Sequence, residues 1–259
     1  SLLGKKVTSD VMMGCGKCKR CTDGRQHTCA DRFELGIRNG FNGALAEKLL
    51  IPARFVYVLP DDFDFELAAL VEPAANAWRV ADGAKPAPGK RILIWGTGTV
   101  GLLTAQFCLA MGAEVHMVGR NPATLSLAKD LGVHFSTQEF EEVDGGFDAI
   151  IDATNSAAVP AEALARVEPG GRVVYIGVSG VPSTLDSRSL VLKDVTAVGI
   201  LSASPGLKGT IDFYSRGEID PRPIVAATVG LSKTSDVLSG KKIDGAGIGP
   251  KIHIDPRIM

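Results

Sequence analysis

The sequence lacks the marks of membrane, secreted and nucleic-acid-binding proteins. It contains no uninterrupted apolar run of about 18 residues, so no transmembrane helix is expected. The first residues, SLLGKKVTSD, lack the basic, apolar and small-residue regions of a signal peptide, and we expect a cytoplasmic protein. A formal net charge of −1 provides no general attraction for nucleic acid or an anionic membrane. The composition, with 45% hydrophobic and 22% charged residues, predicts a soluble globular protein of one large or two ordinary domains.

Cysteine is scarce and unevenly placed. Four of the five cysteines follow the spacing C-x2-C-x2-C-x7-C: Cys15, Cys18, Cys21 and Cys29. Zn²⁺ favours four tetrahedral thiolates, and a complete sulfur shell leaves no open position for substrate, so we predict a structural zinc site. The fifth, Cys108, is expected to be a core residue on a helix. His27 lies inside the cluster and is expected to be a solvated loop residue, because four sulfurs already complete the shell.

Three other interpretations of the cluster are weaker. Disulfides concentrate in small secreted domains, which this sequence does not resemble. Catalytic thiols usually occur singly or as one Cys-x2-Cys pair. A zinc knuckle that grips nucleic acid would need interleaved aromatic side chains, and the overall charge also counts against it.

A glycine-rich motif follows in the segment GKRILIWGTGTVGLLTAQFCLAMGAEVHMVGR. Residues 91–95 and 114–118 have the apolar character of buried parallel strands, and residues 99–111 have a helical pattern. Gly96, Gly98 and Gly101 form G-x-G-x-x-G between them, which is the context that a dinucleotide-binding turn requires. We therefore predict that residues 96–101 bind a pyrophosphate: Gly96, Thr97, Gly98, Thr99, Val100 and Gly101.

The residue after the second strand indicates which dinucleotide binds. An acidic residue there would bind the adenosine ribose and repel a 2′-phosphate, but the sequence has Gly119, followed by Arg120 and Asn121. Because the Arg120 guanidinium can grip a phosphate, NADP(H) is favoured over NAD(H). The alternative is that Arg120 is an ordinary surface residue without a role in cofactor choice and that the protein binds NAD.

Strands and helices continue to alternate to about residue 201, which predicts a doubly wound parallel α/β sheet. The segment AAVPAEALARVEPGG is expected to be a helix stopped by Pro169 and Gly170, with a strand from Arg172. Six residues follow the ends of later strands and are candidate walls of the nicotinamide site: Thr154, Asn155, Gly177, Val178, Leu201 and Ser202.

The cysteine lobe followed by "GTGTVG" resembles the zinc-dependent medium-chain alcohol dehydrogenases, along nearly the whole chain. The resemblance implies a β-rich GroES-like catalytic domain, here residues 1–82 and 221–259 with a zinc lobe at 14–30, interrupted by a Rossmann domain at 83–220. It implies a homodimer or homotetramer that oxidises an alcohol or reduces a carbonyl. It also assigns the four cysteines as the structural zinc ligands.

The segment VEPAANAWRV resembles the Glu-Pro segment of the sorbitol, threonine and glucose dehydrogenase branch, so Glu72 is implied at a catalytic zinc. From the residues alone, a solvated helix-start Glu is the commoner case. The catalytic zinc Cys and the Gly-His-Glu segment of the family have no counterpart among the fourteen residues before Cys15, so we expect the sequence to begin late.

The expected function is hydride transfer between a secondary alcohol, polyol or sugar and NADP(H). Two alternatives stay open: a zinc-free reductase of enones or quinones on the same scaffold, and a non-catalytic fragment that binds zinc and nucleotide.

Overall fold

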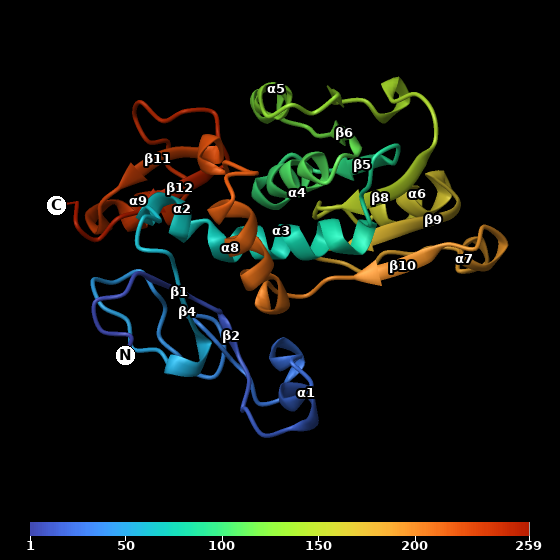
Figure 1. Ribbon diagram of the computed structural model, residues 1–259. Coiled ribbons are helices and arrows are strands. Elements are labelled where there is room, and N and C mark those ends of the chain that lie inside the picture. Colours follow the sequence, from blue (N-terminus) through green and yellow to red (C-terminus); the bar gives the residue numbers. More distant parts are fainter. Residues whose placement is uncertain (259) are drawn as a thin grey trace. The chain divides into compact units, whose positions relative to one another are not determined.

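A computed structural model describes residues 1–258 (Figure 1). The chain forms two compact units: the first comprises residues 1–75 together with the stretch that begins at Ser202, and the second comprises Asn76–Leu201. Both divisions lie earlier in the chain than the borders expected from the sequence at residues 82/83 and 220/221. The first division falls inside helix α3 (Val71–Ala84), which runs without a break past the expected border at residues 82/83.

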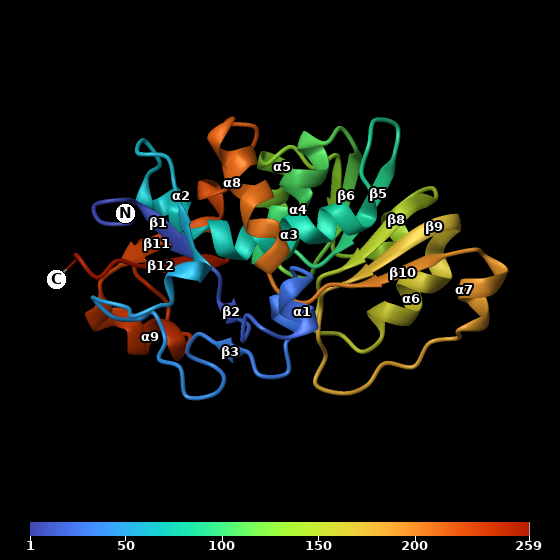
Figure 2. The same cartoon turned by 60° about the horizontal axis from the view of Figure 1, so that its bottom comes forward.

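The second unit is built on a six-stranded parallel sheet in the order β10-β9-β8-β5-β6-β7 (Figure 2). This is the doubly wound order: β5, β6 and β7 extend the sheet in one direction, and β8, β9 and β10 extend it from β5 in the other. The strands are β5 (Arg91–Trp95), β6 (Glu114–Val118), β7 (Phe135–Thr137), β8 (Phe147–Asp152), β9 (Val167–Tyr175) and β10 (Thr196–Gly199). The helices are α4 (Thr99–Ala110), α5 (Pro122–Asp130), α6 (Val159–Arg166) and α7 (Arg188–Leu192).

Apolar strand residues form the core of this sheet. Leu93, Ile150 and Val173 lie in register on neighbouring strands, and all three are completely buried. Helix α4 contacts β5 and β6, and α6 contacts β8 and β9. The helix α4 is buried along most of its length, including Cys108, where burial raises the pKa of the thiol to about 12. Cys108 is therefore the core residue that the sequence predicted.

The expectation for Pro169 and Gly170 is wrong. Helix α6 already ends at Arg166, and β9 begins at Val167. Pairing with β8 passes from Val167 directly to Arg172, and Gly170 has φ +75°. Pro169 and Gly170 thus form a bulge within the strand, because a positive φ and a missing N–H interrupt a ladder locally without ending it.

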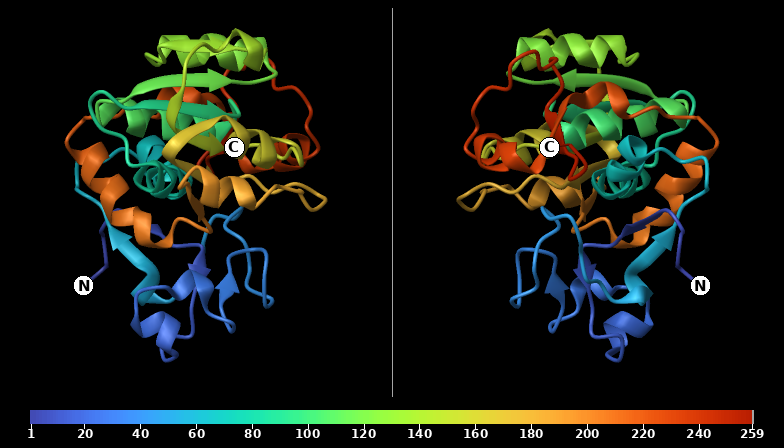
Figure 3. Two further views of the ribbon diagram at one scale, coloured as in Figure 1. Left: turned by 90° about the vertical axis from the view of Figure 1, so that its right-hand side faces the viewer. Right: turned by 90° about the vertical axis from the view of Figure 1, so that its left-hand side faces the viewer.

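The first unit has short elements. Its strands are β1 (Val7–Ser9), β2 (Met12–Met13), β3 (Phe33–Glu34), β4 (Val56–Val58), β11 (Val225–Val229) and β12 (Lys251–Ile254), and its remaining helices are α1 (Lys19–Thr22), α2 (Phe65–Ala69), α8 (Leu207–Ser215) and α9 (Thr234–Leu238). The pairs β1–β4 and β2–β3 are antiparallel, and β11–β12 is parallel. Figure 3 shows that the blue N-terminal stretch consists of such short strands, the short helix α1 and loops. No helix within residues 1–258 is both long and apolar enough to cross a membrane.

Gly101 determines how closely α4 approaches the end of β5. A Cβ atom on Gly101 would overlap the Gly96 carbonyl oxygen and lie 3.0 Å from the carbonyl carbon. At Gly98, which has φ −81°, a Cβ atom would meet no atom within 4 Å. The two glycines of one motif therefore serve different purposes: Gly101 serves packing, and Gly98 leaves open space.

We expect Gly101→Ala to lower the free energy of unfolding by about 1–3 kcal/mol, because helix and strand end must move apart. Gly98→Ala is the matched control and should change stability by no more than about 0.5 kcal/mol. Chemical denaturation of the two variants measures both values. Equal denaturation midpoints would contradict the packing role of Gly101.

Candidate functional site

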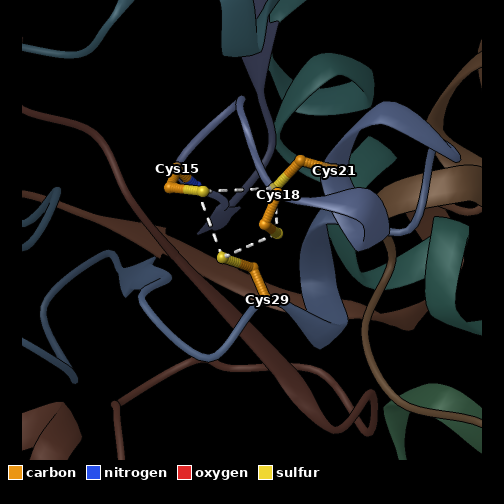
Figure 4. A group of neighbouring side chains, drawn as sticks. All are labelled: Cys15, Cys18, Cys21 and Cys29. Atoms are coloured by element: carbon orange, nitrogen blue, oxygen red, sulfur yellow. Dashed lines mark hydrogen bonds between the residues drawn. The ribbon is translucent and has the colours of Figure 1, made fainter.

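The four clustered cysteines converge on one point (Figure 4). Their Sγ atoms all lie within 4.8 Å of one another, with distances of 3.6 Å from Cys18 to Cys21, 3.8 Å from Cys18 to Cys29 and 4.0 Å from Cys15 to Cys21. All four are free thiols. A tetrahedron with Zn–S bonds of about 2.3 Å has edges of about 3.8 Å, so these three distances are close to those of a tetrahedral Zn²⁺ site.

Backbone groups around the cluster favour thiolate at Cys15. The backbone N–H groups of Lys17 and Cys18 lower the pKa of the Cys15 thiol to about 6. Burial raises the pKa of Cys21 to about 12, partly opposed by the backbone N–H of Gly16. A cation bound by all four sulfurs would stabilise the thiolate form of Cys21, since a coordinated thiol is deprotonated.

Close packing around the sulfurs explains one of the glycines. A Cβ atom on Gly14 would lie 2.5 Å from the Cys21 Sγ and 2.8 Å from the Gln26 Cβ. His27, expected to be solvated, is only 5% exposed, so that expectation is wrong. The short 3-10 helix of Gln26–Thr28 turns the His27 side chain inward, which sequence periodicity cannot show for so short an element.

Asp10 attaches the cysteine lobe to the strands before it, and the sequence gave no reason to select it. Its carboxylate is completely buried and accepts hydrogen bonds from the Met12 backbone N–H at 3.0 Å and the Gln26 Nε2 at 3.2 Å. Arg54 Nη2 donates to the Gly14 carbonyl at 3.1 Å. The lobe is thus held by one residue that precedes it in the sequence, Asp10, and by one that follows it, Arg54.

The glycine turn leaves an open position at the N-terminus of α4. Gly96 has φ +110°, and a Cβ atom there would lie 2.6 Å from the Ala153 carbonyl oxygen, so the loops after β5 and β8 touch through their backbones. Gly98 is exposed and caps α4, with Thr99 and Val100 in its first turn. Free backbone N–H groups and the helix dipole make this position suitable for a pyrophosphate.

The end of β6 has no room for an acidic side chain. A Cβ atom on Gly119 would lie 2.9 Å from the Thr97 Cβ and closer still to the Thr97 Oγ1. Thr97 is held in this place by a hydrogen bond of 2.7 Å between its hydroxyl and that of Thr124. A side chain at position 119 would therefore require Thr97 to move from this place.

The next two predicted residues differ in their surroundings. Arg120 is exposed, and its carbonyl accepts a hydrogen bond from Gln138 Nε2 at 2.9 Å. Asn121 caps α5, because its Oδ1 accepts from the Ala123 N–H at 3.0 Å. Asn121 therefore has a structural role as the cap of α5, whereas the Arg120 side chain is exposed to solvent.

Of the predicted nicotinamide walls, the structure brings Thr154 and Gly177 into contact. A Cβ atom on Gly177 would overlap the Thr154 carbonyl oxygen. Asn155 and Val178 are exposed, and the Leu201 carbonyl accepts from Arg79 Nη1. Ser202 belongs to the other unit, where it is buried with φ +72°.

Glu72 lies in the first turn of α3 and is half-buried, between the completely buried Val71 and Ala74. Among residues 1–258, the four cysteines are the only group of three or more His, Cys, Asp or Glu side chains that is placed to hold a metal. The described residues therefore do not gather a second ligand set around Glu72.

Comparison with known proteins identifies the family. Residues 2–61 match the alcohol dehydrogenase GroES-like domain, and residues 99–216 match the family described as zinc-binding dehydrogenase. The zinc-type alcohol dehydrogenase-like protein YdjJ of Escherichia coli strain K12 is 30% identical over 234 residues, which are 86% of this chain and 67% of YdjJ. The chain belongs to the zinc-type medium-chain alcohol dehydrogenase family.

Other members of this zinc-type family are similar over comparable lengths. L-threonine 3-dehydrogenase of Shewanella loihica is 29% identical over 209 residues, 76% of this chain and 60% of the relative. Sorbitol dehydrogenase of Bacillus subtilis is 27% identical over 248 residues, 91% of this chain and 70% of the relative. The chain thus spans between 60% and 70% of the length of these two curated relatives.

Two solved structures show the same fold. The alcohol dehydrogenase RspB of Escherichia coli CFT073, complexed with NADH, has a TM-score of 0.86 at 24% identity and covers 94% of this chain and 75% of its own. A zinc-binding dehydrogenase of Sinorhizobium meliloti, bound to NADP, has a TM-score of 0.87 at 24% identity. The match covers 98% of this chain and 77% of that dehydrogenase.

We expect the purified protein to contain one zinc per chain, held by the four cysteines, and Cys29→Ala to lose it. Cys108→Ala is the matched control, because this buried thiol lies on α4 in the other unit and should leave zinc content unchanged. Elemental analysis after dialysis measures the zinc. A Cys29→Ala variant that retains its full zinc content would contradict the assignment.

Proposed function

We propose that this protein is an oxidoreductase that transfers a hydride between an alcohol and NADP(H). The observation that carries the proposal is the open glycine turn: Gly98 leaves free space before the N-terminus of α4, at the point where the strand order reverses between β5 and β8. Doubly wound folds bind dinucleotides at this point. The family membership adds the reaction class, and the sorbitol and threonine dehydrogenase relatives favour a secondary alcohol, polyol or sugar as substrate.

In this proposal, the chain's residues bind and orient the reactants. Gly96, Gly98 and Gly101, with Thr97, Thr99 and Val100 between them, form the pyrophosphate turn. Thr154, Asn155, Gly177 and Val178 lie on the loops after β8 and β9, where they would bound the nicotinamide, together with Leu201 and Ser202 after β10. When bound, the nicotinamide would carry the hydride and a catalytic zinc would act as Lewis acid on the substrate oxygen.

Glu72 is our candidate for a carboxylate at the catalytic zinc. Its half-buried place among completely buried neighbours supports this, because a carboxylate that is partly removed from water is stabilised by a cation. The structural zinc has a separate role: it shapes the lobe, since four sulfurs leave no position for substrate.

The reaction is tested by following NADPH formation from NADP⁺ with a panel of secondary alcohols, polyols and sugars. We expect turnover by the intact protein to be abolished by a zinc chelator and restored by added Zn²⁺. Turnover that survives complete zinc removal would contradict the zinc mechanism and favour the zinc-free reductase of enones or quinones. Tight NADPH binding without oxidation of any alcohol would favour a non-catalytic binding protein.

The preference for NADP(H) rests on the contact between Gly119 and Thr97. The two solved structures with this fold hold NADH in one case and NADP in the other, so the fold itself does not choose. Here the Thr97 side chain occupies the space that an acidic residue at position 119 would need, and the exposed Arg120 follows directly. Without a carboxylate to repel it, a 2′-phosphate can meet the Arg120 guanidinium.

Arg120→Ala should therefore raise the dissociation constant of NADPH by about tenfold or more, as expected for loss of one charged hydrogen bond, and leave that of NADH nearly unchanged. Fluorescence titration with both cofactors measures the effect. Lys129→Ala, at the other end of α5, is a control for loss of one positive charge. Equal losses for both cofactors would show that Arg120 does not contact the 2′-phosphate.

We further propose a homodimer or homotetramer in the cytoplasm. The oligomer follows the resemblance to the family, and the cytoplasm agrees with a cluster of four unpaired thiols, which a reducing compartment preserves.

A further inference from the structure

A buried carboxylate lies at the point where the strand order reverses. Asp152 is the last residue of β8 and is 1% exposed. Its register partners on the neighbouring strands are Trp95, the last residue of β5, and Tyr175, the last residue of β9. Burial raises the pKa of Asp152, and burial, together with the nearby Asp152 carboxylate, raises the pKa of Tyr175. A carboxylate in such a place is costly unless it is well hydrogen-bonded.

Asp152 accepts hydrogen bonds from the two loops that follow β8 and β9. Its Oδ1 accepts from the Thr154 backbone N–H at 2.9 Å and from the Thr154 hydroxyl at 2.7 Å. The Thr154 hydroxyl in turn accepts from the Ser156 N–H at 3.1 Å. The Asp152 backbone carbonyl accepts from the N–H groups of Ile176 at 3.0 Å and Gly177 at 2.9 Å. One residue therefore holds both loops through its side chain and its backbone.

The same loops touch the glycine turn. Gly96 packs on the backbone of Ala153 and on the Thr154 Cγ2, while Gly177 packs on the Thr154 backbone. Thr154 is consequently enclosed by three strand ends and oriented by Asp152. These contacts are all made within the chain, so they restrict the two loops, and restricted loops lose less entropy on binding.

We infer that Asp152 is the positioning residue for the nicotinamide half of the dinucleotide: it orders Thr154 and the adjoining loop without contacting the cofactor. The inference rests on the proposed function. It predicts that Asp152 matters for the nicotinamide end of the cofactor and is immaterial for the adenosine end, which lies toward Gly119 and Arg120.

The test compares two ligands by calorimetric titration: NADPH, and 2′,5′-ADP, which lacks the nicotinamide (NADH and ADP, if the wild-type protein binds that pair instead). Asp152→Ala should weaken NADPH by about tenfold and leave 2′,5′-ADP unchanged, because the Thr154 donors lose their acceptor. Asp152→Asn keeps an acceptor oxygen in place and should recover most of the NADPH affinity.

Asp148→Ala is the matched control. Asp148 lies near the opposite end of β8 and accepts hydrogen bonds from Lys90 Nζ at 2.7 Å and the Arg91 N–H at 2.9 Å. Its loss removes a similar number of contacts from the same strand and should alter neither affinity. If Asp152→Ala does not fold, Thr154→Val, which removes the hydroxyl donor, is tested for the same selective loss.

The inference is wrong if these variants weaken both ligands equally, weaken neither, or if Asp152→Asn binds NADPH no better than Asp152→Ala. A wild-type protein that binds neither pair of ligands shows instead that the proposed function is wrong, and the inference falls with it.

Discussion

Backbone-to-backbone contact at the carboxyl edge of the parallel sheet is the constraint on which the rest of the second unit depends. Gly101 places α4 against the Gly96 carbonyl, Gly96 places its own turn against Ala153, and Gly177 places the loop after β9 against Thr154. Each contact is closer than a side chain permits. The three loops therefore form one surface, and the N-terminus of α4 opens onto it with its N–H groups free for an anion.

The cysteine lobe is held by a different kind of interaction. Strands of two residues and a helix of four bury too little apolar surface to order a segment of this length. The four sulfurs lie at distances suited to a metal ion, and a metal bound there would contribute directly to the folding of the lobe. The buried Asp10 adds a second attachment, through hydrogen bonds that leave its carboxylate satisfied inside the protein.

In both regions, features that depend on neighbouring residues were predicted from the sequence, and features that depend on distant packing partners were not. The strands β5 and β6 match their predicted bounds, because apolar runs flanked by glycine leave few alternatives. Pro169 and Gly170 misled the prediction, because the same residue types can end a helix or form a bulge, and only the partner strand decides which. His27 was misjudged for a similar reason: its burial depends on what packs over a one-turn element.

From the sequence by itself, the spacing of the cysteines and of the glycine motif determined the family resemblance and where the turn before α4 lies. These features are local, and their chemistry follows from residue type and separation alone. Only the tertiary structure decided that Thr97 excludes an acidic residue at position 119, and that Asp152 holds the loops around Thr154 and Gly177. In the first case the residues are separated by more than twenty positions, and in the second Gly177 follows a different strand from Asp152 and Thr154, so no pattern along the chain pairs them. The folding of the parallel sheet brings them together.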